Sequence, residues 1–454
     1  MRRKKDITII NFSLPVSTGD PKNKIIRVVP IGPLYIVSFL EKRGFSVGFK
    51  DYQLNGFKNP FDSDNILSFL TSSSNIVGIR SDSHLLPFLI YAIRKLKQKF
   101  PKKIIILGGP GPTSVAEILI KNFPFIDVIV KGEGEHTTLD LMQHLKKKEK
   151  LDDVKGIVFK KKDGSIRETP LRKRIDNLDK LPFPAYYKLN PKDYQRINII
   201  ASRGCPFKCT FCDVAPFWQH CNISRSIDNV IEEIYYFQDI FHFKRFGFSD
   251  DNFVLDRKKV LEFCDKFKKS GINAQWSAYG RVNLMDDILM KKMSKAGCYG
   301  IFFGVESGSN RVLKKIKKGF TAAKARELII RSTKYFEKVC ASFMWDFPFE
   351  SLSDFLKTIK LMNELSRNPK IITQIFLLTP IATTALYQEY KDTLTFPKKE
   401  FGSLVYPVRK KLIAEKGIFD LIKKYPEIFS FFYRFKSIEF DSKRRIIKSM
   451  GINI

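Results

Sequence analysis

Residues 202–213 read SRGCPFKCTFCD and place three of the chain's seven cysteines, Cys205, Cys209 and Cys212, on one short stretch. A structural zinc site or an electron-carrying iron–sulfur cluster takes four protein ligands, so these three thiols are one ligand short. A C-x3-C-x2-C spacing can hold three irons of a cubane and leave the fourth iron open. An open metal position is what a catalytic centre requires.

The residues around the cysteines shape this loop. Pro206 discourages a regular helix, and we expect Arg203 and Lys208 to favour thiolate over thiol. The alternative is a zinc knuckle with His220 or Cys221 as a distant fourth ligand, although the chain has no second C-x2-C partner.

Outward from this loop, the second half of the chain alternates strand-like and helix-like stretches. A strand at 196–205 runs into the cysteines, and a helix is expected at 226–241. Similar βα units follow at 243–271, 273–297 and 299–309, and around 339–351 and 371–380. Repeated βα units with polar residues after each strand predict a partial (β/α) TIM-like barrel with its chemistry at the carboxyl ends of the strands.

The first half shows the same alternation with a different spacing. Short β-branched stretches predict strands at 6–12, 46–52, 76–81, 103–109 and 127–135. Helical patterns lie between or after them at 31–44, 86–100, 114–123 and 138–148. This order predicts an α/β fold, a Rossmann-like doubly wound parallel sheet that binds ligands beyond its strand ends.

Four regions result. We predict a Rossmann-like domain at 1–150, a hairpin and Pro-rich connector at 151–190, the barrel at 191–400 and a C-terminal segment at 401–454. The connector hairpin turns at Asp163-Gly164. The last segment is basic and rich in aromatic residues, which predicts a packed, mostly helical cap, with peripheral membrane contact as the alternative.

Composition restricts the function classes. The 454 residues carry a formal charge of +33, but the basic residues are scattered, which argues against a dedicated nucleic-acid site. No apolar run is long enough to span a bilayer. Sparse cysteines, absent before residue 205, suit a reducing setting, so we expect a cytoplasmic protein, with membrane association as the alternative.

The cysteine stretch, with an aromatic residue before its last cysteine, resembles the signature of the radical S-adenosylmethionine (radical SAM) superfamily. The resemblance extends to FSDDNF (248–253) and to the region 280–309 with its GVESG sequence. It implies a [4Fe-4S] cluster that reductively cleaves S-adenosylmethionine to a 5′-deoxyadenosyl radical. The implied ligands of the cluster are Cys205, Cys209 and Cys212, and the implied S-adenosylmethionine-binding residues are Phe211, Asp250, Arg281 and Glu306.

The N-terminal half is similar to the cobalamin-binding domain found in one branch of this superfamily. The similarity covers residues 30–47, 104–113, 126–137 and 176–184. Glycines at the strand ends would let a nucleotide tail approach the backbone. The implied cobalamin-binding residues are Ser83, Leu85, Gly108, Gly109, Gly132 and Glu133. DSHLLP (82–87) imitates a cobalt-ligand motif after the wrong strand, so we interpret His84 as a loop histidine.

This resemblance implies cobalamin-dependent methylation of an unactivated carbon. The alternatives are a cobalamin-dependent radical cyclisation or rearrangement, and a degenerate binding protein without catalysis. A tRNA-modifying methylthiotransferase is disfavoured because residues 1–204 contain no cysteine. The implied partners are a small-molecule or lipid substrate and a one-electron reductant such as flavodoxin or ferredoxin. Two later motifs deviate from the family: DFPFES (346–351) and TPIATTALY (379–387) lack expected glycines.

Overall fold

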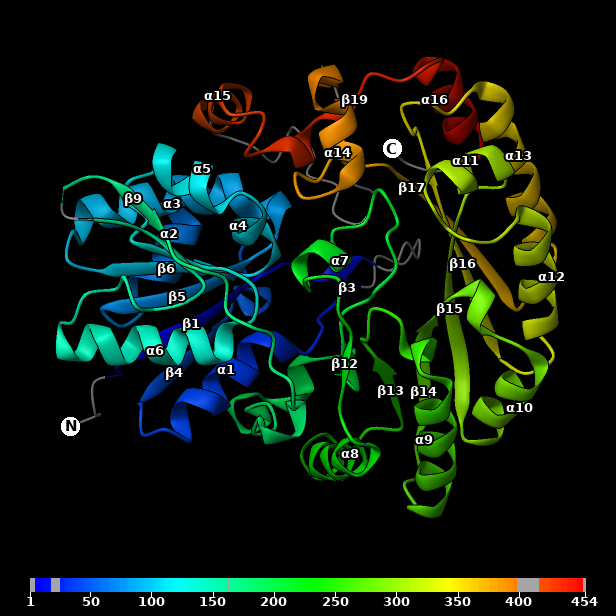
Figure 1. Cartoon of the computed structure of the whole chain (residues 1–454), viewed down its shortest axis with the longest axis horizontal. Coiled ribbons are helices and arrows are strands. Elements are labelled where there is room, and N and C mark those ends of the chain that lie inside the picture. Colours follow the sequence, from blue (N-terminus) through cyan, green and yellow to red (C-terminus); the bar gives the residue numbers. More distant parts are fainter. Residues whose placement is uncertain (1–4, 18–24, 162, 398–415, 452–454) are drawn as a thin grey trace. The chain divides into compact units, whose positions relative to one another are not determined.

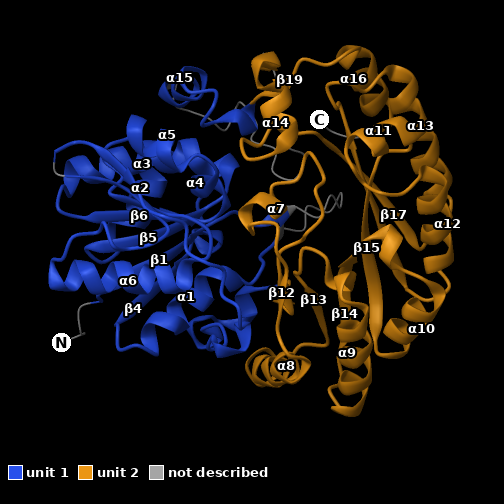
Figure 2. Cartoon of the chain, viewed as in Figure 1, with its two compact units in different colours: residues 1–195, 408–432 blue, residues 196–407, 433–454 orange. Residues whose placement is uncertain are grey.

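The computed structural model describes residues 5–17, 25–161, 163–397 and 416–451, which fold into two compact units. The first unit comprises residues 1–195 and 408–432, and the second comprises residues 196–407 and 433–454 (Figure 2). Each unit is built on its own sheet, and its helices and strands are labelled in Figure 1.

The first unit has a seven-stranded sheet in the order β4-β1-β5-β6-β7-β8-β9. The strands are β1 (Ile7–Phe12), β4 (Val47–Asp51), β5 (Ile76–Ser81), β6 (Ile104–Gly108), β7 (Val128–Val130), β8 (Ile157–Lys160) and β9 (Ile166–Glu168). The first five in spatial order are parallel, and β8 and β9 add an antiparallel edge. Every residue of β1 is buried, as expected for a central strand covered on both faces. The doubly wound prediction is confirmed.

Helices cover both faces of this sheet (Figure 1). They are α1 (Ile31–Glu41), α2 (Ser63–Thr71), α3 (Leu86–Lys99), α4 (Pro110–Ser114), α5 (Ala116–Asn122) and α6 (Gly134–Lys147). Helix α1 contacts α6 on one face, and α2 contacts α3 on the other. A small antiparallel pair, β2 (Val16–Ser17) and β3 (Ile25–Ile26), precedes α1.

Two sequence predictions in this unit are wrong in detail. Helix α2 was not predicted, because its buried apolar stripe is limited to Ile66 and Leu70 and its start depends on a local cap. The side chain of Asp62 accepts hydrogen bonds from the first backbone N–H groups of that helix. The strand predicted at 127–135 ends at Val130, because Gly132 has a φ of 72° and turns the chain into α6.

The second unit has a six-stranded parallel sheet in the order β10-β13-β14-β15-β16-β17. The strands are β10 (Asn198–Ile199), β13 (Arg245–Phe248), β14 (Gln275–Gly280), β15 (Cys298–Glu306), β16 (Lys338–Trp345) and β17 (Ile371–Leu377). Within the described residues β10 and β17 each pair with one neighbour only, so the sheet does not close. The predicted partial barrel is confirmed.

Helices cover the outer face of this sheet (Figure 1). They are α8 (Ile227–Phe241), α9 (Arg257–Lys269), α10 (Asp287–Lys295), α12 (Ala322–Ser332) and α13 (Leu352–Leu365). Two further helices, α11 (Asn310–Lys315) after β15 and α14 (Ala385–Tyr390) after β17, share one apolar cluster. An aromatic core under α9 joins helix to sheet: the Phe248 ring lies 4.2 Å from that of Phe253 and 5.0 Å from that of Phe263, centroid to centroid. Two short strands, β11 (Ser202–Arg203) and β12 (Ile223–Ser224), pair antiparallel at the start of the unit.

The C-terminal residues are divided between the units (Figure 2). Helix α15 (Lys416–Lys424) contacts α3 in the first unit, and the Tyr425 ring lies 5.3 Å from that of Phe123. Strand β19 (Arg434–Phe435) pairs with β18 (Leu394–Thr395), and α16 (Phe440–Ser449) contacts α13, all within the second unit. Among the described residues, no helix combines the length and hydropathy needed to cross a bilayer.

Candidate active site

The cysteine stretch is a loop between β11 and β12, and Gly204 fixes its entry. Gly204 has a φ of 99°, and a Cβ atom at this position would lie 2.1 Å from the carbonyl oxygen of Cys221. Its N–H donates to the Asp251 carboxylate at 2.9 Å, and its carbonyl accepts from the Asn222 side chain at 2.7 Å. Only glycine fits here, because any side chain would meet backbone and would strain φ.

We therefore expect Gly204→Ala to displace the cysteine loop. A matched control is Gly271→Ala: Gly271 has a φ of 73°, but a Cβ atom there would meet nothing within 4 Å, so this variant carries only the backbone strain of ~1–2 kcal/mol. After anaerobic iron reconstitution, Gly204→Ala should retain less than roughly a third of the iron of the control. Equal iron content in the two variants would contradict this account of the loop.

Two of the three thiols, those of Cys205 and Cys212, lie where burial favours their protonated forms. Burial raises the pKa of the Cys205 thiol, and it raises the pKa of Cys212 to about 12. The positive charge of Arg281 opposes the shift at Cys205. Desolvation is the largest effect on both thiols, and the cation that acts on Cys205 is Arg281. Metal binding would have to displace these protons, so iron loading should be favoured by higher pH.

The chemistry of the donor set fits an iron–sulfur cluster, because thiolates are the protein ligands of such clusters. No group of three or more His, Cys, Asp or Glu side chains in the described part of the chain is close enough to hold one metal ion. A cubane binds each thiolate through a different iron, so its ligands stand farther apart than those of zinc. The loop is also anchored on both sides: Thr210 N–H donates to Ile316 at 3.3 Å, and the Thr210 carbonyl accepts from Leu386 N–H at 2.8 Å.

Arg281, at the end of β14, lies beside the cysteines. Its Nη1 is 3.5 Å from the Sγ of Cys209, and its guanidinium carbon is 3.8 Å from the centre of the Phe207 ring. Its Nη2 donates to the carbonyl of Lys318. A cation held this way can balance the negative charge that a thiolate-ligated cluster brings into a buried site.

Glu306 ends β15 in a left-handed conformation, with a φ of 69°. Its Oε1 is 3.2 Å from the Nζ of Lys318, and the two side chains are only 11% and 7% exposed. Lys318 Nζ in turn lies 5.9 Å from the centre of the Phe211 ring. Sequence reasoning missed Lys318, because nothing in the stretch KKGF distinguishes a buried, paired lysine from the solvated lysines around it.

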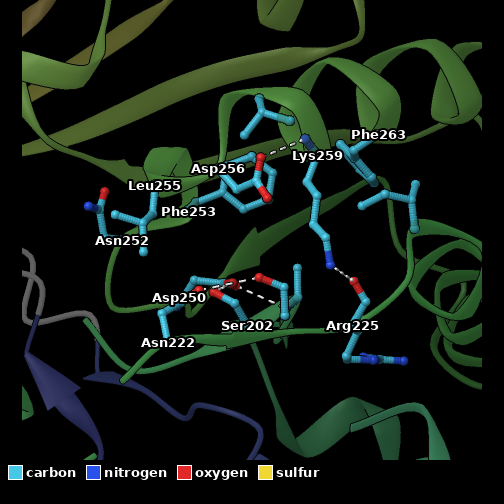
Figure 3. Close-up of a pocket in the computed structure, with 14 residues that line it drawn as sticks. Ser202, Asn222, Arg225, Asp250, Asn252, Phe253, Leu255, Asp256, Lys259 and Phe263 are labelled. Carbon is cyan, nitrogen blue, oxygen red and sulfur yellow. Dashed lines mark hydrogen bonds between the residues drawn. The ribbon is translucent and has the colours of Figure 1, made fainter. Parts of the chain in front are cut away.

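Asp250, one of the implied S-adenosylmethionine-binding residues, is fully engaged in hydrogen bonds within the second unit. Its carboxylate accepts from Ala201 N–H at 3.0 Å and from the Ser202 hydroxyl at 2.6 Å, tying β13 to the segment that leads into the cysteine loop (Figure 3). Burial raises its pKa to about 7. These contacts make Asp250 a support for the loop.

A small pocket adjoins Asp250 (Figure 3). Its lining residues include Ser202, Asn222, Arg225, Asp250, Asn252 and Lys259. Asn252 is 4% exposed, and its carboxamide oxygen and nitrogen have no hydrogen-bond partner among the described residues. A buried amide in that state is available to a bound polar group.

In the first unit, glycines shape the strand ends where the resemblance implied a nucleotide tail. Gly109 has a φ of 89°, and a Cβ there would lie 2.9 Å from the Arg80 side chain and 3.2 Å from the Ser81 carbonyl oxygen. Gly108 would make only ordinary contacts, and a Cβ on Gly132 would meet nothing within 4 Å. Gly132 therefore leaves the turn after β7 free of side-chain bulk, whereas Gly109 is required because β5 packs closely against it.

The other implied cobalamin-binding residues lie at two neighbouring turns. Ser83 and Leu85 form a short 3-10 turn after β5, and Leu85 is buried. Glu133 lies between β7 and α6, where it accepts from Arg174 Nε and from Ile175 N–H, both at 2.9 Å. Its side chain thereby fixes the connector against this turn.

His84, interpreted as a loop histidine, is in fact buried. Its ring centroid lies 5.6 Å from that of Phe431, in the C-terminal segment that belongs to the same unit. Burial lowers its pKa to about 4, so the ring is neutral near pH 7. His84 is therefore part of the packing under the strand ends.

Comparison with known proteins agrees with both halves. The family model described as the radical SAM superfamily matches residues 199–362, and that of the B12 binding domain matches residues 27–142. An uncharacterized methyltransferase of Pyrococcus horikoshii is 29% identical over 361 residues, covering 77% of each chain. The anaerobic magnesium-protoporphyrin IX monomethyl ester cyclase of Rubrivivax gelatinosus is 27% identical, covering 86% of this chain and 71% of its own.

The solved structure of OxsB, a cobalamin-dependent S-adenosylmethionine radical enzyme with aqua-cobalamin and S-adenosylmethionine bound, has a similar fold. The TM-score is 0.68 at 18% identity, and the match covers 99% of this chain and 66% of OxsB. The likeness therefore extends over both units of this chain and about two thirds of the OxsB chain.

Proposed function

The chain belongs to the radical SAM enzymes that carry a cobalamin-binding domain, and we propose that it methylates an unactivated carbon of a small-molecule substrate. The observation that supports this proposal most strongly is the surroundings of the cysteine loop. Arg281 lies 3.5 Å from Cys209, and the buried Glu306–Lys318 pair lies beside Phe211. The Pyrococcus relative is named a methyltransferase, which supports methyl transfer as the proposed reaction.

The protein's part in this reaction is to bind and orient. A bound [4Fe-4S] cluster would supply the electron that cleaves S-adenosylmethionine, and cobalamin would supply a carrier for the methyl group. Cys205, Cys209 and Cys212 would hold the cluster. Arg281 would offset its negative charge, and the aromatic ring of Phe211 would lie against the adenine.

Glu306 and Lys318 would recognise the amino-acid end of S-adenosylmethionine. This end presents an ammonium and a carboxylate, the same two charges that Lys318 and Glu306 present to each other at 3.2 Å. We propose that Glu306 accepts from the ammonium and Lys318 donates to the carboxylate. Gly108, Gly109 and Gly132, with Ser83 and Leu85, would border the cobalamin tail.

The experiment is anaerobic reconstitution with iron, sulfide and hydroxocobalamin, followed by metal analysis. About four irons and one cobalt per chain are expected. Incubation with S-adenosylmethionine and a one-electron reductant should then yield deoxyadenosine. Iron without cobalt would overturn the methyltransferase proposal, and zinc in place of iron would overturn the radical chemistry altogether.

The cyclisation named for the Rubrivivax relative can be distinguished from methylation with isotopically labelled S-adenosylmethionine. With S-adenosylmethionine labelled in its methyl group, methylation transfers the label to the substrate, whereas cyclisation leaves the substrate unlabelled.

A further inference from the structure

The turn after β16 departs from its family pattern and carries a buried charge cluster. Asp346 stands where the family pattern has glycine, with a φ of 71° and 2% exposure. A left-handed conformation costs a non-glycine residue ~1–2 kcal/mol, and burying a carboxyl adds to that cost. Contacts with the surrounding structure must offset both the backbone strain and the cost of burying the carboxyl.

The offset comes from the C-terminal residues of the same unit. The Ser437 hydroxyl donates to Asp346 Oδ1. Lys443, on α16 and 0% exposed, places its Nζ 3.8 Å from Asp346 Oδ1 and 3.6 Å from Glu350 Oε2. The same ammonium donates to the Glu350 carbonyl at 2.7 Å, and Asp346 N–H donates to Glu350 Oε2 at 2.8 Å.

The two carboxyls of this cluster are buried next to the same ammonium. Two carboxyls share the ammonium of Lys443, while Arg434 acts on Asp346 from β19 and Glu350 interacts with Arg311 on α11. Burial raises the pKa of both Asp346 and Glu350 to about 7. The Oε1 of Glu350 has no hydrogen-bond partner among the described residues, so no donor there stabilises the ionised form.

This turn also supports the cysteine loop. Phe347 is completely buried, and its ring centroid lies 6.1 Å from that of Phe211. Phe347 shares an apolar cluster with Ile316, whose carbonyl accepts the N–H of Thr210. A shift of the turn would therefore move the surface against which Phe211 rests.

We propose that Lys443 is a positioning residue for the active site: by holding Asp346 and Glu350 it fixes the turn that carries Phe347 and so sets the place of Phe211 in the cysteine loop. The inference deepens the proposed function and depends on it for its catalytic consequence. Helix α16, which lies far from the cysteines in the sequence, would then help to position the cysteine loop.

The first test follows the loop itself in metal-free protein. Hydrogen–deuterium exchange should become faster in Lys443→Met at residues 346–351 and also at 207–212. Lys448 is an exposed lysine on the same helix, and Lys448→Met should leave the exchange rates of both regions unchanged. Faster exchange at 346–351 without any change at 207–212 would overturn the proposal. This readout needs no activity, so it separates failure of the inference from failure of the proposed function.

The second test uses pH and rescue. Deoxyadenosine formation per loaded cluster should fall roughly 10- to 100-fold in Lys443→Met at pH 8, the size expected when a reacting group is misplaced. At pH 6 the loss should be smaller, because both carboxyls are then largely protonated and no longer need the ammonium. A merely structural role would lower iron loading but not the rate per loaded cluster.

The double variant Lys443→Met/Asp346→Gly removes one carboxyl and supplies the residue that tolerates positive φ. It should recover most of the wild-type rate at pH 8. Protein that folds and loads iron but shows no recovery would overturn the proposal, as would a rate in Lys443→Met equal to wild type at both pH values.

Discussion

After anaerobic reconstitution, Cys209→Ser is expected to hold well under one iron per chain instead of about four, and deoxyadenosine formation should fall by at least roughly a hundredfold. Two thiolates cannot retain a cubane, and a serine hydroxyl does not ionise readily enough to replace the third. Iron and sulfide analysis, with quantification of deoxyadenosine after a fixed incubation, measures both effects.

The matched control is Cys221→Ser. Cys221 is an exposed thiol that follows the loop but lies outside the C-x3-C-x2-C spacing. It should keep its full iron and activity if the three loop cysteines are the ligands. An equal loss in the two variants would instead point to a four-ligand site that includes Cys221, which is the zinc-knuckle alternative.

Glu306→Gln is expected to weaken S-adenosylmethionine binding and to destabilise the second unit. A charged hydrogen bond contributes ~1.5–3 kcal/mol, so the Kd should rise roughly 10- to 100-fold. The variant also leaves the ammonium of Lys318 buried without its counter-charge, which costs ~3–5 kcal/mol of unfolding free energy. Equilibrium dialysis of reconstituted protein and urea unfolding of metal-free protein measure the two effects.

The double variant Glu306→Gln/Lys318→Met separates the effect on S-adenosylmethionine binding from the effect on stability. Removing both charges should return the unfolding free energy to within ~1–2 kcal/mol of wild type, because no charge is then left unpaired. Binding should remain weak, since neither group of the ligand has its partner. Normal binding in the double variant would show that this pair serves stability alone.

The cluster ligands could be proposed from the sequence alone because their signal is local. The spacing of Cys205, Cys209 and Cys212 lies within one loop, and the strand before it is visible as an apolar run. The alternation of strands and helices in both halves is likewise a short-range pattern, so the two sheets and the open barrel were predicted correctly. Helix α2 was missed because it buries few apolar residues and its start depends on the Asp62 cap.

The roles of single polar residues depended on contacts that the sequence does not contain. Asp250 was proposed only as a cofactor-binding residue, and the structure adds that its carboxylate accepts hydrogen bonds from Ala201 and Ser202. Glu133 and His84 lie in loop-like stretches, yet one pairs with Arg174 and the other is buried against Phe431. Each of these partners is remote in sequence, so only the folded chain could identify it.

What the sequence alone determined is the class of chemistry, because three thiols at a fixed spacing on one loop are a local pattern that can be read without the fold. What only the tertiary structure decided is how the site is supported. The left-handed Asp346 is tolerated because Lys443, almost a hundred positions later, brings a buried ammonium to it, and Lys318 pairs with Glu306 from beyond the far end of α11. Buried charges are stable only next to their partners, and folding alone determines where those partners lie.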